Sequence, residues 1–236
     1  MSVHVNGLRD AYANIKEAIT RHIREATTLC IRQVVMFNQI IVLNIGRHFQ
    51  GIRISSSEGF HLALSRFEAF TAEANSLLRA LSASQCVEGD VMPFIVKAQG
   101  DVTQCLAIGN RHNHKRYQTL MGRAHAQYYK SYDLTFNIKI RLPAFHSARL
   151  MASDAIARFM YYACCDIGKA IRLATTARQR AKKQVVETTI TMNELESAHL
   201  DYLTQNISFW KEDLAQKRQT VRITLTSHLI PDYIFH

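Results

Sequence analysis

The scarcity of residues that end helices constrains this fold more than any other feature. The 236-residue chain contains nine Gly and three Pro, and the only one of these between Phe145 and Leu229 is Gly168. An all-β fold needs a turn about every 8–12 residues, whereas long helices need few. Hydrophobic residues make up 47% of the chain, which is enough for a sizeable core. The sequence therefore predicts an all-α protein.

The sequence predicts three long helices, and the first two are separated just before Pro93. Apolar residues repeat every three or four positions from Leu8, and this helix is expected to loosen around Gly51–Gly59 and resume to about Ser82. A second helix is expected from Pro93, because a missing amide costs nothing in a first turn, and it continues to about Arg141. Helices of about 50 residues are rods of roughly 75 Å. Such rods must bury their apolar stripes against each other or against a second copy.

A turn at Pro143 is expected to separate the second helix from a third. Proline removes a backbone donor and moves the preceding residue away from helical angles. The third helix is expected over residues 145–229, and Pro231 ends it. We therefore expect one helical domain over residues 1–229, followed by a C-terminal tail, 230–236.

Apolar residues near the end of the third helix step by three and four, as in a coiled-coil seam. A monomer would leave such a seam exposed, so the pattern predicts a coiled-coil dimer. The predicted seam consists of Leu200, Leu203, Ile207, Trp210 and Leu214.

Positive charge is concentrated in one third of the chain. The stretch Thr103–Val186 holds fifteen Lys and Arg against three acids, a net charge of +12, whereas the whole chain is +10. Localised positive charge indicates an anionic partner surface. A plain solvated face is the alternative, but such helices usually mix charges of both signs, and this stretch does not.

On ideal helices these charges form two stripes, with arcs of about 40° and 80°, that are expected to lie side by side as one basic face. The stripe on the second helix consists of Arg116, Arg123, Lys130 and Arg141. The stripe on the third helix consists of Arg158, Lys169, Arg172, Arg180 and Lys183.

No motif for catalysis or for a cofactor is present. His112 and His114 point about 200° apart on a helix and could not share a metal ion. The chain has no phosphate-binding glycine loop, nucleophile elbow or zinc-protease motif. We therefore expect no enzyme activity, no metal and no cofactor.

The cysteines and the termini predict a cytoplasmic protein. The five cysteines are odd in number and form no CxxC pair, which favours a reducing compartment. Adjacent Cys164 and Cys165 are expected to be small buried hydrophobes. The first ten residues lack a signal-peptide pattern. The most apolar run, Ile31–Ile45, is shorter than the roughly 18 unbroken apolar residues of a membrane span.

Several short motifs occur in an order that resembles the BAR domain of the retromer-associated sorting nexins. They are LNIGRHF at Leu43–Phe49, ALSR at Ala63–Arg66, Ala72, Glu73, Leu77, Gln85, the basic and aromatic run Lys115, Arg116 and Tyr117, and the pairs Tyr202–Leu203 and Leu214–Ala215. The resemblance implies three long kinked helices that dimerise antiparallel into a crescent, whose concave face binds curved anionic membrane. No phosphoinositide-binding PX domain is present in this chain, which leaves lipid selectivity open.

The leading functional hypothesis is a dimeric scaffold that senses or remodels membrane curvature. The resemblance implies a location on endosomal membrane, a homodimer or paralogous heterodimer, and a retromer-type coat as partner. Nucleic acid is the alternative partner, because Lys and Arg also neutralise phosphates and the basic stretch contains tyrosines that could stack on bases. These are Tyr117, Tyr128, Tyr129 and Tyr132. A coiled-coil adaptor whose basic face binds an acidic protein is a third possibility.

Overall fold

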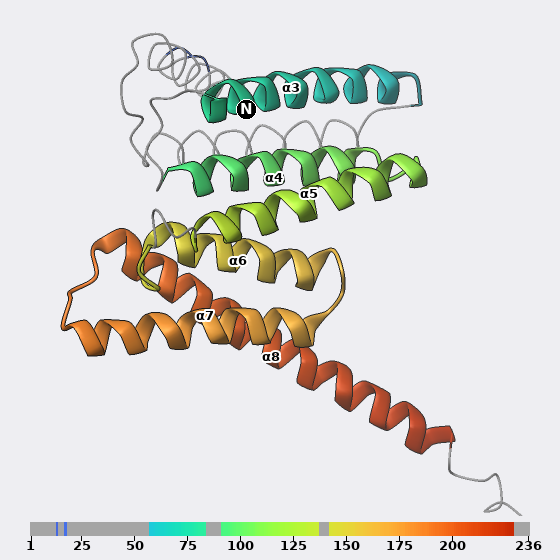
Figure 1. The fold of residues 1–236 in the computed structure, drawn as a ribbon. Coiled ribbons are helices and arrows are strands. Elements are labelled where there is room, and N and C mark those ends of the chain that lie inside the picture. The colour runs from blue at the N-terminus through green and yellow to red at the C-terminus, as the bar shows by residue number, and fades with distance from the viewer. Residues whose placement is uncertain (1–12, 14–16, 18–56, 84–90, 137–141, 229–236) are drawn as a thin grey trace, which may run out of the picture. The chain divides into compact units, whose positions relative to one another are not determined.

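All regular secondary structure in the residues that the structure describes is helical. The computed structural model describes residues 57–83, 91–136 and 142–228, together with residues 13 and 17. These residues form six α-helices and no strand, which confirms the all-α class for this part of the chain (Figure 1). The helices are α3 (Ser57–Ala83), α4 (Met92–Gly109), α5 (His114–Leu134), α6 (Ser147–Tyr162), α7 (Ile167–Thr188) and α8 (Glu194–His228). The apolar run Ile31–Ile45, Arg141 and the tail 230–236 lie outside the described residues.

Three features of the expected layout are confirmed. Helix α3 ends at Ala83, within one residue of the expected end at Ser82, and it begins at Ser57, inside the stretch Gly51–Gly59. Pro93 lies in the first turn of α4, where its missing amide needs no partner. The turn at Pro143 is present, and the backbone amide of His146 donates to the Pro143 carbonyl at 3.0 Å.

The long second and third helices are wrong, because the chain breaks at three further points. The second expected helix is two helices, α4 and α5, and the third is α6, α7 and α8. A short polar side chain precedes each unexpected helix and accepts the backbone N–H of the residue three positions later. The acceptors are Asn113 for Arg116 (3.1 Å), Asp166 for Lys169 (2.8 Å) and Asn193 for Glu196 (2.9 Å). These caps satisfy amides that a helix start leaves open.

The chain divides into two compact units, Met1–Leu142 and Pro143–His236. In the first unit, α4 contacts both α3 and α5. Helices α3 and α4 approach closely at Gly109. A Cβ on Gly109 would lie 2.4 Å from Phe67 Cε1, so no larger residue fits there without movement. The single domain expected over residues 1–229 stays a prediction.

In the second unit, each of α6, α7 and α8 contacts the other two. Two cross-helix hydrogen bonds show that α6 and α8 run parallel. Asn206 Nδ2 donates to Asp154 Oδ1 at 2.7 Å, and seven residues further along both helices the Tyr161 hydroxyl donates to Asp213 Oδ2 at 2.8 Å. Since α7 connects and contacts both, it runs in the opposite direction (Figure 1).

The residues of the predicted seam lie mainly in the core of this second unit. Leu214 is half-buried and the other four are buried within the single chain: Leu200, Leu203, Ile207 and Trp210. The expectation that a monomer would leave them exposed is therefore wrong. The helical period identified a packing stripe, but α6 and α7 of the same chain are available to cover it. A dimer stays a prediction, but it is not needed to explain how these residues are buried.

Candidate anion-binding faces on α5 and α7

Helix α7 carries its buried small residues and the basic residues of the predicted stripe on different faces. Its buried residues are mostly alanine: Ala170, Ala174 and Ala181. At 100° per residue, the arc of the predicted basic residues is centred about 140° from these alanines. These basic residues are Lys169, which is half-buried, and Arg172, Arg180 and Lys183, which are exposed. We call these four residues the α7 face.

Little negative charge accompanies the α7 face. Helix α7 contains six basic residues and one acid, Glu187. Glu187 Oε1 lies 3.6 Å from Lys183 Nζ, but both side chains are mostly exposed, so water screens the pair and weakens it. At 100° per residue, Arg178 and Lys182 lie about 160° and 120° from the centre of the α7 face, so they are not part of it. The helix therefore keeps a strongly positive outer side.

Helix α5 carries a second basic row, made of Arg116, Arg123 and Lys130, which we call the α5 row. The three residues are seven positions apart and all are exposed. One of them already has a partner, because Arg116 Nη2 lies 2.8 Å from Glu68 Oε1 of α3. The α5 row therefore offers less positive charge to a partner than the α7 face does.

Arg158 does not belong to the α7 face. It lies on α6, and the turn before α7 removes the continuous helix that would have aligned it with Lys169. Its Nε lies 2.8 Å from Asp154 Oδ2, and its guanidinium carbon lies 5.9 Å from the centre of the Tyr202 ring on α8. Arg158 thus joins α6 to α8. Its place in the predicted stripe was wrong.

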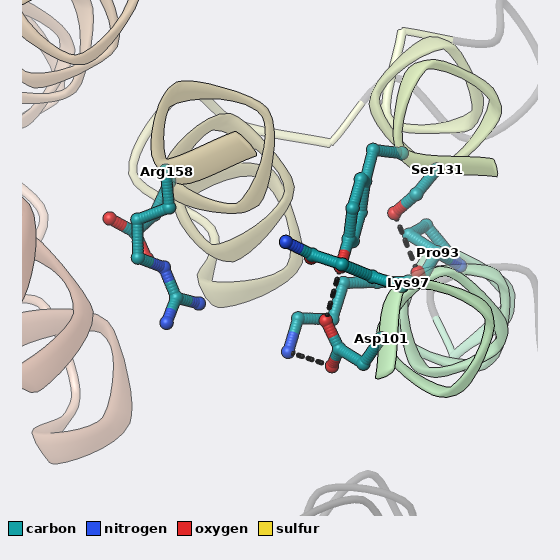
Figure 2. Close-up of polar contacts among 8 residues, drawn as sticks. Pro93, Lys97, Asp101, Ser131 and Arg158 are labelled. Atoms are coloured by element: carbon teal, nitrogen blue, oxygen red, sulfur yellow. Dashed lines mark hydrogen bonds and ion pairs between the residues drawn. The ribbon is translucent and has the colours of Figure 1, made fainter. Parts of the chain in front are cut away.

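The inner side of α5 is fixed to α4 by polar contacts (Figure 2). Lys97 and Asp101 form an ion pair one turn apart on α4. The Tyr128 hydroxyl of α5 lies 2.9 Å from Asp101 Oδ1 and 2.7 Å from Gln104 Oε1. Ser131 Oγ donates to the Pro93 carbonyl at 2.7 Å. Because these polar groups satisfy one another, the cluster serves to hold α5 in register.

The structure revises two further expectations about side chains. Cys164 and Cys165 are exposed, not buried, because α6 ends at Tyr162 and both lie in the following turn. Of the four tyrosines proposed to stack on bases, Tyr128 is buried and the other three are half-buried: Tyr117, Tyr129 and Tyr132. They do not form an open stacking surface.

Other classes of site find no support in the described residues. Within them, no three His, Cys, Asp or Glu side chains gather as a metal ion would require. None of the described helices combines the length and the apolar character needed to cross a membrane.

Comparison with protein-family models and with curated protein sequences finds no match to this chain.

Proposed function

We propose that this protein binds anionic membrane surfaces peripherally through the α7 face, with the α5 row as a weaker second contact. The observation that carries the proposal is the division of α7 into a buried alanine side and an outer basic side with a single acid. A helix packed in this way can present its charges without losing its core contacts.

The charge of the α7 face is sufficient for binding. A Lys or Arg near an anionic leaflet contributes about 1 kcal/mol, so four contribute about 4 kcal/mol, or roughly 10³-fold in partitioning. From Lys169 to Lys183 the face spans about 21 Å of helix. The α5 row should add less, since Arg116 is already paired with Glu68.

Exposed apolar side chains near the ends of α7 favour a membrane over nucleic acid. Val186 is 77% exposed close to Lys183, and Tyr162 is 63% exposed just before α7 begins. Apolar side chains beside basic ones are typical of surfaces that enter the boundary between headgroups and acyl chains. Binding to single-stranded nucleic acid would instead use a row of open aromatic rings. The tyrosine rings of α5 are buried or half-buried, and Tyr162 is a single open ring beside α7.

The BAR-type features expected from the sequence stay predictions. Curvature sensing by a BAR-type crescent requires long continuous helices, and the caps at Asn113, Asp166 and Asn193 interrupt them. Kinship with the sorting nexins, dimerisation, a retromer-type coat and an endosomal location therefore stay predictions. The charge of the α7 face and the exposed apolar side chains near its ends support peripheral membrane binding without them.

The direct test is co-sedimentation of the purified protein with vesicles that contain increasing shares of phosphatidylserine in phosphatidylcholine. Binding should rise with the anionic share and fall as salt shortens the screening length from about 10 Å at 0.1 M to about 3 Å at 1 M. Gel-shift assays with DNA and RNA run beside it. Binding to nucleic acid without binding to anionic vesicles would reject the proposal in favour of the alternative partner.

A further inference from the structure

The turn between α6 and α7 presents two adjacent thiols. Cys165 has φ = 55°, the left-handed conformation that usually favours glycine after a helix end. The Asp166 amide then donates back to the Met160 carbonyl at 2.9 Å, which closes the end of α6. The next residue, Ile167, begins α7. The turn is thus tightly defined, and both cysteines in it are exposed.

The surroundings of this turn combine apolar and basic character. Tyr162, immediately before it, is largely exposed, and the first two members of the α7 face, Lys169 and Arg172, follow within two turns of helix. Partial burial raises the pKa of the Cys164 thiol, and the positive charge of Lys169 opposes that rise. Cys105 differs, because stronger burial raises its pKa to about 12.

We propose that Cys164 and Cys165 are a site of S-acylation by a long-chain fatty acyl group, so that an acyl chain and the α7 face form a two-part membrane anchor. This inference rests on the proposed membrane binding. The donor is a fatty acyl-coenzyme A thioester. The cysteine sulfur bonds to the acyl carbonyl carbon, the bond from that carbon to the coenzyme A sulfur breaks, and coenzyme A leaves with the proton. No oxidation or reduction occurs.

The physical reason for combining the two features is that neither is a strong anchor alone. A single acyl chain gives marginal and reversible membrane binding, and a chain together with a basic patch gives stable binding. Cysteines beside an amphipathic basic helix are positions where reversible acylation is effective. The basic side chains hold the turn at the surface where acyl chains partition, and the acyl chain would then keep the α7 face there when salt rises.

The test begins with site selectivity. The purified full-length protein is incubated with palmitoyl-coenzyme A in neutral detergent micelles, which do not require the α7 face, and hydroxylamine-sensitive acylation is mapped by peptide mass spectrometry. We expect the peptide that contains Cys164 and Cys165 to carry at least about tenfold more acyl groups than the peptide that contains Cys105, and to lose them in the double variant C164S/C165S. The matched variant C105S should react like the native protein. Equal acylation of Cys105, or a disulfide between the pair in place of an acyl group, would overturn the proposal.

The second measurement is retention on vesicles. Acylated protein should remain on phosphatidylserine-containing vesicles in about 1 M salt, where the unmodified protein is released because screening is strong. If the double variant misfolds, the single variants C164S and C165S replace it. Each keeps one thiol and should therefore keep partial retention. Failure of the unmodified protein to bind at low salt would reject the proposed function. Low-salt binding with acylated protein that is still released at high salt would reject the two-part anchor alone.

Discussion

Helices α5 and α7 are the basic helices of the two units, but their inner sides are held in different ways. The buried side of α7 is formed by alanines, in a unit whose core holds the fully buried Trp210 of α8. The inner side of α5 instead holds polar groups, Tyr128 and Ser131, that bind partners on α4. The inner side of α7 packs through small apolar residues, whereas that of α5 combines the apolar Leu120 and Ala124 with a polar cluster.

Their outer sides differ as well. In the α5 row, Arg116 forms an ion pair with Glu68 of the neighbouring helix, whereas in the α7 face Lys183 forms an ion pair with Glu187 of its own helix. The basic residues of α5 and of α7 look alike in sequence but have different surroundings in the fold. Basic residues near an acid of a packed neighbour stabilise the fold, and those opposite a small-residue face stay available to a partner.

The largest expected effect concerns the apolar core beneath α7. Trp210→Ala should lower the free energy of unfolding of the second unit by about 3–5 kcal/mol, because it removes the largest fully buried side chain. Phe209→Ala is the matched control, since Phe209 is about half exposed, and should cost less than about 1 kcal/mol. Urea unfolding followed by circular dichroism measures both. Equal losses would show that the seam residues do not form the core described here.

A smaller effect is expected from the polar cluster beneath α5. Tyr128→Phe keeps the ring and removes the hydroxyl that Asp101 and Gln104 share, which should cost about 1–3 kcal/mol. Tyr129→Phe, on the same helix, is the control and should be close to neutral. The same urea titration applies. A neutral Tyr128→Phe variant would mean that the cluster does not hold α5 in place.

Alkaline pH should weaken each unit through a different group. Burial, with Asp101 nearby, raises the pKa of Cys105 from 9.0 to about 12 in the first unit. Burial, and the hydrogen bond to Asp213, raise that of Tyr161 from 10.0 to about 12 in the second. The unfolded chain loses these protons first, so the free energy of unfolding should fall from about pH 9 to 12. Unfolding measured at several pH values should show a shallower decline in Cys105→Ala and in Tyr161→Phe.

The parts of the fold that were predictable from sequence depend on strong local signals. Pro93 and Pro143 mark a helix start and a turn by covalent geometry alone. The stripe from Leu200 to Trp210 is buried as its helical period requires. The period could not identify what covers the stripe, since an intramolecular and an intermolecular partner require the same apolar pattern.

The breaks were missed because the residues responsible are compatible with a helix interior as well as with its start. Asn113 and Asp166 lie between segments with no glycine or proline signal strong enough to separate them. Asn193 with Glu196 is a reciprocal capping box that could have been recognised: each side chain accepts the other's backbone amide. A continuous helix would align Arg158 with the α7 face and bury the two cysteines, and the turn between α6 and α7 prevents both.

The most direct measurement compares charge reversal on the two helices in one vesicle-binding assay. The α7 variant is R172E/R180E/K183E, the α5 variant is R116E/R123E/K130E, and R79E on α3 is a control in a helix without a basic face. We predict that the α7 variant loses at least about 100-fold in affinity for phosphatidylserine vesicles and that the α5 variant loses less, with unchanged helicity by circular dichroism. Equal losses in the two variants, or a larger loss in the α5 variant, would contradict the assignment of binding to the α7 face.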